Sequence, residues 1–101
     1  MKYLECPDLK ENKIVSFYSN LNNEVFRFLF KWNDYCGCCF LDIYDNDGNE
    51  VKTGNALCAN RIIKGDTRIL PIFYFIHKDG LNLEPTPETM KDYRLYADIA
   101  E

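Results

Sequence analysis

Five cysteines are the residues of this 101-residue chain with the most obvious capacity for chemistry. Cys36, Cys38 and Cys39 crowd one short connection, while Cys6 and Cys58 lie apart in the sequence. A structural zinc site usually needs two ligand pairs with C-x(2–4)-C spacing, and the second pair is missing. An odd number of thiols also cannot pair completely within one chain. We therefore interpret the cysteines as small, weakly polar residues that fill strand positions.

His77 is the single histidine of the sequence. It could act as a zinc ligand together with Cys36, Cys38 and Cys58, or as the base that activates one of the thiols. Nothing in the spacing of these residues requires either arrangement. A lone histidine at the end of a strand is more often a surface residue or a hydrogen-bonded filler, so we expect no cysteine chemistry here.

The segment of residues 45–50, DNDGNE, resembles part of an EF-hand calcium loop. Placing Gly48 at loop position 6 puts Ile43 at position 1 and Gly54 at position 12, and both of these positions need a carboxylate. The calcium interpretation therefore fails. Asp47-Gly48 between two alternating runs instead predicts a tight hairpin turn.

Three further kinds of functional site are not supported by the sequence. Asp42 and Asp45 are separated by an odd number of positions, which sends their carboxylates to opposite faces of a strand. No glycine-rich phosphate loop and no Ser-His-Asp constellation can be proposed from the sequence. We expect no catalytic, cofactor-binding or metal-binding residues, no cofactor, and a protein that is not an enzyme.

An aromatic row in the segment 24–32 is the strongest structural signal of the chain. Every second residue from position 26 to position 32 is aromatic: Phe26, Phe28, Phe30 and Trp32. Side chains alternate between the faces of a strand, so these four rings share one face. Such a row could stack on the bases of a single-stranded nucleic acid, but a core face agrees better with the acidic charge of the chain.

Alternation and turn signals place the remaining strands. They predict further strands or strand-like runs over residues 13–19, 38–45, 50–57, 68–77 and 91–99. Gly54 suggests a bulge or a bend, and Pro71 marks an edge strand, a strand start or a bulge. A short helix is the alternative for residues 91–99.

The predicted fold is all-β, an antiparallel sandwich or barrel of about 6–7 strands with a long C-terminal loop. Residues 1–101 are expected to form a single domain, and residues 1–12 form an extended lead-in that can supply one edge strand. Residues 82–88 should run as an extended loop because of Pro85 and Pro87. Thr86 at an N-cap and Pro87 at N1 predict about one helical turn there.

The net charge and the lengths of the apolar runs argue against some classes of function. The net charge of −4 argues against nucleic-acid binding through a general basic surface. Glu5 stands where the apolar part of a signal peptide should begin, and the longest apolar run, residues 69–76, has the length of a strand and contains a proline. We expect a soluble protein made in a cytoplasm.

Several short motifs, in order and with fitting spacing, make the chain resemble the phage baseplate plug family, small tail proteins of contractile-tailed bacteriophages. The FLDIYDNDG block of residues 40–48 is the specific part of the likeness. The supporting matches are Phe28-x-x-x-Trp32-Asn33, Thr53-Gly54, Leu57, Gly65, Glu84-Pro85-Thr86 and Arg94-Leu95-Tyr96. The likeness covers about residues 26–96. The CGCC connection departs from it, because glycines followed by a large aromatic are expected there.

The resemblance implies a non-enzymatic structural protein of the virion tail, made in the cytoplasm of a bacterial host. It would sit in the axial channel of the baseplate, in contact with hub and tail tube proteins, without a cofactor. In isolation we expect a monomer or a weak homo-oligomer. The loops around Pro85 and Pro87 and the cysteine connection are the expected contact surfaces, since loops commonly carry binding. The alternative is a small β-sandwich or barrel module that binds a peptide or a carbohydrate.

Overall fold

Two antiparallel four-stranded sheets make up the computed structural model, which describes residues 2–21, 23–64 and 70–98. The strands are β1 (Lys2–Glu5), β2 (Ile14–Leu21), β3 (Glu24–Asn33), β4 (Cys38–Asp45), β5 (Glu50–Leu57), β6 (Arg61–Ile63), β7 (Phe73–His77) and β8 (Tyr93–Ala97), with one 3-10 helix, η1 (Met90–Asp92). The all-β prediction is confirmed. The expected number of about 6–7 strands was too low, since the described residues hold eight, of which β1 and β6 are too short to show a clear pattern.

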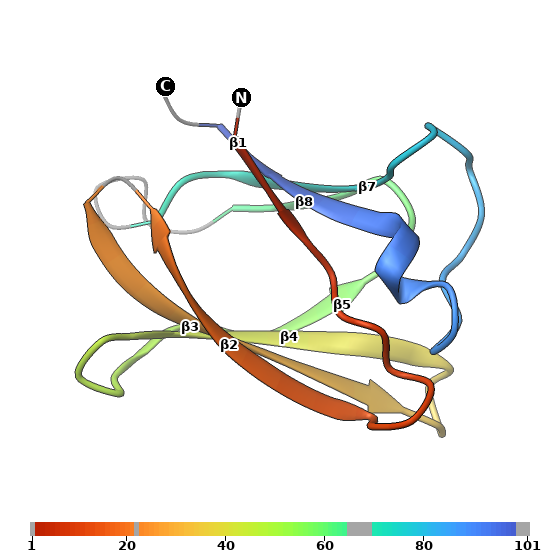
Figure 1. Ribbon diagram of the computed structural model, residues 1–101, viewed down its shortest axis with the longest axis horizontal. Coiled ribbons are helices and arrows are strands. Elements are labelled where there is room, and N and C mark those ends of the chain that lie inside the picture. The colour runs from red at the N-terminus through yellow and green to blue at the C-terminus, as the bar shows by residue number, and fades with distance from the viewer. Residues whose placement is uncertain (1, 22, 65–69, 99–101) are drawn as a thin grey trace.

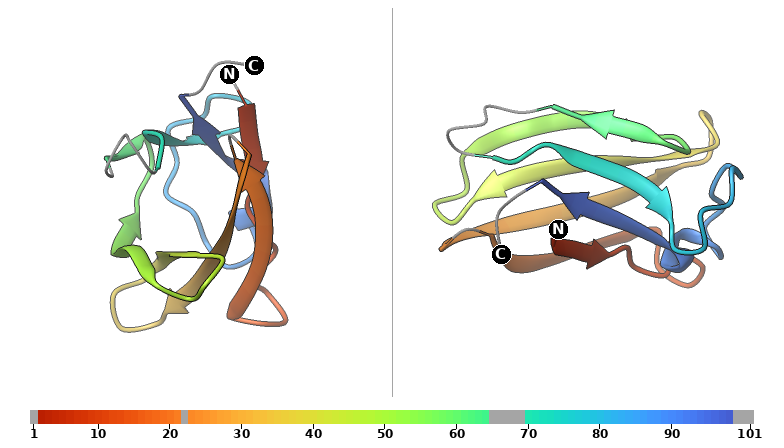
Figure 2. Two further views of the ribbon diagram at one scale, coloured as in Figure 1. Left: turned by 90° about the vertical axis from the view of Figure 1, so that its left-hand side faces the viewer. Right: turned by 90° about the horizontal axis from the view of Figure 1, so that it is seen from above.

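The sheets form a sandwich. One is the meander β2-β3-β4-β5, and the other has the order β1-β8-β7-β6. Figure 1 shows the sheet with β7 and β8 above the sheet with β3 and β4. Seen from above in Figure 2, β8 lies between β7 and β1. The lead-in therefore does supply an edge strand, and it pairs with the last strand of the chain.

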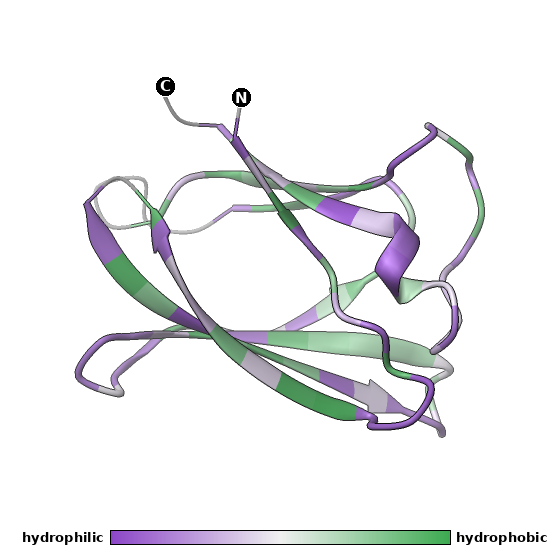
Figure 3. Ribbon diagram, viewed as in Figure 1, coloured by the Kyte–Doolittle hydropathy of each residue, from purple (hydrophilic) through white to green (hydrophobic). Residues whose placement is uncertain are grey.

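The aromatic row of β3 is the centre of the core. Phe26, Phe28 and Phe30 are buried, and Trp32 is half-buried, which confirms the core-face interpretation. The alternation of inward and outward residues appears as bands of opposite hydropathy along the strands (Figure 3). Across the sandwich Phe28 meets Phe73 of β7, with ring centroids 5.9 Å apart and ring planes at 89°. This edge-to-face contact joins the two sheets directly.

The Asp47-Gly48 turn is confirmed as the hairpin between β4 and β5. Gly48 N–H donates to the Asp45 carbonyl (3.1 Å), and Gly48 has φ of +85°, a left-handed conformation that favours glycine. The Asp45 carboxylate accepts the N–H groups of Asp47 and Asn49, each at 2.9 Å. The bonds from Asn49, followed by those from Asp47 and Gly48, lower the pKa of Asp45. The carboxylate that suggested calcium binding is thus occupied in closing the turn.

The predicted bulge at Gly54 is also confirmed. Leu41 pairs with Asn55 whereas Ile43 pairs with Lys52, so β5 has one extra residue between these pairs. Gly54 has φ of +70°. Next to the bulge, Asn55 is buried and its amide Nδ2 donates to the Leu41 carbonyl at 3.0 Å.

Two predicted boundaries were wrong. The expected strand 68–77 extends too far towards its start: residues 70–72 precede β7, which begins at Phe73, because Pro71 has no N–H for a ladder. In the expected strand 91–99, η1 occupies the start and β8 begins at Tyr93. The helix alternative is wrong for residues 93–97. Residues 65–69, which include the family match at Gly65, and residue 99 lie outside the described residues.

Helices contribute little to this fold. Within residues 2–21, 23–64 and 70–98, no helix has the length and apolar character needed to cross a membrane.

The Phe28 contact leads to a first prediction. Phe28→Ala should lower the free energy of unfolding by about 3–5 kcal/mol, because it removes a fully buried ring and leaves a cavity between the sheets. Urea unfolding followed by tryptophan fluorescence measures this loss. Tyr18→Ala is the control: Tyr18 is 64% exposed on β2, and its removal should change the value by no more than about 0.5 kcal/mol. Equal losses for the two variants would contradict the assignment of Phe28 to the core.

Candidate functional site

The loops expected to make contacts gather at one end of the sandwich, on the right in Figure 1. We call this surface the loop end and define it as residues 6–13, 34–37, 58–60 and 78–92. Hydrogen bonds and an ion pair connect the four segments. They join Leu9 N–H to the Pro87 carbonyl (3.0 Å), Ala59 N–H to Glu84 Oε2 (3.2 Å), and Lys13 Nζ to Asp34 Oδ2 (2.7 Å).

Tyr93 fastens the long loop to the core. Its ring is buried and stacked on Phe75, with centroids 4.8 Å apart, and its hydroxyl donates to the Leu83 carbonyl. Burial, followed by the nearby charges of Glu84 and Asp92, raises the pKa of Tyr93, so the hydroxyl keeps the proton that this bond requires. The loop is therefore held at a fixed point although it has no regular structure.

Further along the same loop, Pro85 is buried rather than presented to solvent. Thr86 accepts N–H bonds from Thr89 and Met90, at 3.1 Å and 3.0 Å through its carbonyl. The predicted single turn is thus present, but Thr89, not Thr86, is the N-cap of η1. Leu83 (59% exposed) remains available on the outside of the loop.

A second surface lies on the outer face of the smaller sheet. The pairing register sets four residues side by side across the strands: Tyr3, Tyr96, Tyr74 and Ile62. We call this row the tyrosine face. The Tyr3 and Tyr96 rings are 5.5 Å apart, and the Arg94 guanidinium lies 4.3 Å from the centre of the Tyr3 ring. Arg94 also donates to the Tyr96 hydroxyl at 3.3 Å, so the rings are braced in place.

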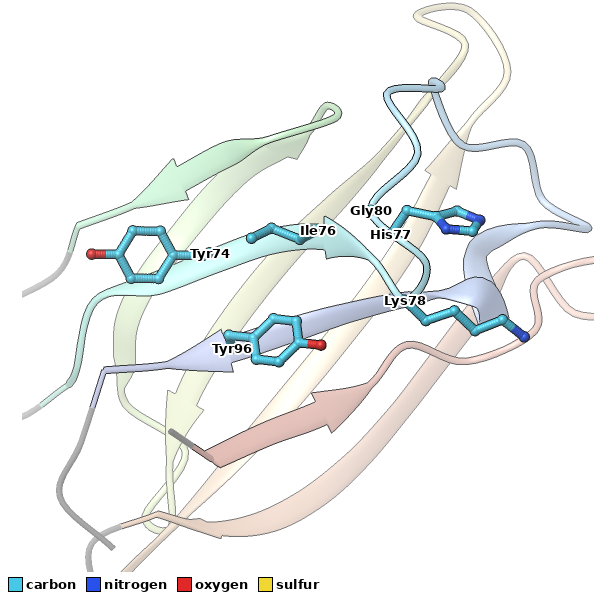
Figure 4. A pocket seen from close by; sticks show the side chains of 6 residues that line it. All are labelled: Tyr74, Ile76, His77, Lys78, Gly80 and Tyr96. Atoms are coloured by element: carbon cyan, nitrogen blue, oxygen red, sulfur yellow. The ribbon is translucent and has the colours of Figure 1, made fainter.

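The tyrosine face continues into the loop end through a hollow of about 480 Å³. Figure 4 shows its lining, with Tyr74 and Tyr96 along the strands and His77, Lys78 and Gly80 where β7 passes into the long loop. His77 Nδ1 accepts the Asp79 N–H at 3.0 Å, and the His77 ring meets Tyr93 edge-on at 5.1 Å. His77 therefore shapes a turn, in agreement with the filler interpretation.

The structure divides the cysteines into two groups. Cys6 and Cys39 are buried in the core, and burial raises the pKa of both thiols, to about 12 for Cys39. Cys36 and Cys58 are exposed, and Cys38 is half-buried. Among the described residues, no three histidine, cysteine, aspartate or glutamate side chains are grouped as a metal site requires. The strand-filler interpretation suits Cys39, whereas Cys36 and Cys58 lie outside the strands.

Asp42 and Asp45 have separate roles. Asp45 closes the hairpin turn, while Asp42 is 4% exposed and lies 2.6 Å from Lys31 Nζ and 2.8 Å from the Gly54 N–H. Burial of Asp42 disfavours its charged form, but the bonds from Gly54 and Lys31 outweigh this effect and lower the pKa of Asp42. The carboxylate therefore holds the bulge in place.

The tyrosine face could not be found from the sequence alone. Tyr74 and Ile76 on one strand, and Arg94 and Tyr96 on another, do alternate with buried residues. That alternation shows only that they face outward. Their alignment across the sheet depends on which strands pair and in what register.

The Asp42 contacts lead to a prediction with a defined pH dependence. Asp42→Asn should lower the free energy of unfolding at pH 7 by about 1 kcal/mol, because the charged bonds to Lys31 and Gly54 are lost and Lys31 is partly exposed. The pKa of Asp42 is lower in the folded state, so its stabilisation is fully present above the ordinary aspartate value of 3.8. It disappears as the pH falls through the lowered pKa.

Urea unfolding of both proteins across the range from about pH 3 to pH 7 measures this difference. Asp34→Asn is the matched control. The Lys13–Asp34 pair is 49% and 68% exposed, so its loss should cost less than about 0.5 kcal/mol. A deficit of Asp42→Asn that is equally large at both ends of the pH range would show that charge is not its source.

Comparison with family models assigns the chain to a family. A family model described as "Cyanophage baseplate Pam3 plug gp18" matches residues 1–99. None of the curated proteins compared with the chain matches it. The family match spans both sheets, the loop end and the tyrosine face. The chain therefore belongs to the cyanophage baseplate plug family.

Proposed function

We propose that this protein is a structural, non-enzymatic part of the phage baseplate that closes the axial channel by contacting hub and tail tube proteins. The observation that carries the proposal is the family match over residues 1–99, which supports a structural role in a baseplate and a place in the virion tail. The family match does not favour the alternative of a peptide-binding or carbohydrate-binding module. In this proposal residues 1–101 act as a single domain, made in the cytoplasm of the bacterial host and binding neither nucleic acid nor membrane.

The loop end and the tyrosine face are the surfaces that we assign to these contacts. Tyrosine and arginine are enriched among the interface residues that contribute most of the binding energy, because they offer large rigid areas together with a polar group. Tyr74, Tyr96 and Arg94 have this character, and the hollow beside them offers a place for a side chain of the partner. The loop end adds the exposed Leu81 and Leu83. The two surfaces are continuous at His77 and Lys78, so one partner can cover both.

Electron microscopy of purified tails that carry a labelled copy of this protein tests the proposed position. Label on the axis of the baseplate supports the plug role. Label at the periphery of the baseplate would refute axial closure, and label absent from the tail would refute the role altogether.

A substitution in the tyrosine face tests the contact surface. Tyr74→Ser should reduce incorporation of the protein into assembled baseplates roughly tenfold, because truncating a central interface tyrosine commonly costs more than about 1 kcal/mol of binding energy. Tyr18→Ser on the outer face of the other sheet is the matched control, and it should be incorporated normally. Quantitative mass spectrometry of purified virions measures both. Normal incorporation of Tyr74→Ser in a folded state would remove this face from the proposed contact.

A further inference from the structure

The register of β4 and β5 brings two cysteines opposite each other. The last pair of this ladder is Cys39 with Leu57, and the next step outward sets Cys38 opposite Cys58. Cys39 and Leu57 both face the core, so alternation turns Cys38 and Cys58 to the same outer face. Residues opposite each other in an antiparallel pair have Cα atoms about 4.5–5.5 Å apart. This separation lies within the range of about 4.4–6.8 Å that a disulfide spans.

The surroundings of the two thiols agree with this placement. After burial, the charges of Cys36 and Cys58 are the next causes that raise the pKa of Cys38, so both of these sulfur atoms lie within electrostatic reach of Cys38. Cys58 is exposed and can meet a reagent in solution, while Cys38 is half-buried. Cys6 and Cys39 are buried in the core and are closed to such a reagent.

We propose that Cys38 and Cys58 are a modification site, at which a low-molecular-weight disulfide converts the two thiols into a cross-strand disulfide bond. The Cys58 thiolate attacks one sulfur of the small disulfide, forms a mixed disulfide and releases one small thiolate. The Cys38 thiolate then attacks the Cys58 sulfur and releases the second small thiolate. The two protein thiols lose two protons and two electrons, and the small disulfide is reduced to two thiols.

The disulfide bond adds a covalent restraint at the loop end. Cys58 is the first residue of a turn, and its carbonyl accepts the Arg61 N–H at 3.0 Å. The N–H of the next residue, Ala59, donates to the Glu84 carboxylate of the long loop. Asn60 in the same turn donates to Asn82 at 2.9 Å. A covalent link from Cys58 to Cys38 therefore ties the start of β4 to the turn that holds the long loop. In the reduced protein, no covalent bond joins Cys58 to Cys38.

The test uses the full-length reduced protein and oxidised glutathione as the small disulfide. Intact mass should fall by two hydrogens. After digestion with trypsin under non-reducing conditions, residues 53–61 should remain joined to residues 32–52. Fragmentation on either side of Gly37 distinguishes Cys38 from Cys36 as the partner. The oxidised protein should melt on the order of 10 °C higher, because the link constrains the unfolded chain, and a reductant should reverse the shift.

Three variants decide the assignment. Cys38→Ser and Cys58→Ser should lose the internal bond and the rise in Tm, while Cys36→Ser should keep both. Circular dichroism checks that each variant is folded, and Cys38→Ala replaces Cys38→Ser if the hydroxyl prevents folding. Three results would overturn the proposal: separate glutathione adducts on the wild type without an internal bond, an internal bond that survives in Cys38→Ala, or one that is lost in Cys36→Ser.

Discussion

The burial of one face of each sheet against the other is the constraint on which the rest of this structure depends. Phe28 and Phe73 meet edge-to-face between the sheets, and Phe17 stacks against Phe28 and Phe30 at 5.9 Å and 5.7 Å. Two sheets closed in this way bury their inner faces only. The outer faces and the ends of the sandwich are left for other roles, and the tyrosine face and the loop end occupy those places.

Tyr93 connects the hydrophobic core to the loop end. Its ring belongs to the core, stacked on Phe75, and its hydroxyl holds the Leu83 carbonyl of the long loop. The His77 ring packs against the same tyrosine. A single buried side chain therefore contacts both the long loop and the residue at which the turn before it begins. A surface whose shape is fixed beforehand loses less conformational entropy when a partner binds, so this coupling suits a binding surface made of loops.

The parts of the fold that were predicted correctly are those encoded by neighbours in the sequence. Alternation in β3 and β4 and the Asp47-Gly48 turn each depend on residues close together in the chain. The pairing of β1 with β8 joins the two ends of the chain, and no local pattern announces it. For the same reason, the position of Cys58 opposite Cys38 could not be predicted from the sequence. Counting back from the pair Tyr44–Glu50 without bulges would set Cys38 opposite Ala56, but two register shifts in β5 bring Cys58 there instead.

Those two shifts also bear on how neighbouring proteins can attach. Each bulge interrupts the ladder of an edge strand, and β5 is an edge of the meander. The edges of the other sheet, β1 and β6, have four and three residues, which offer few backbone groups for strand addition. β2 is the long regular edge, with eight residues. Among the described residues, three of the four edges are thus poor templates for a foreign strand, and β2 is the edge best suited to accept one.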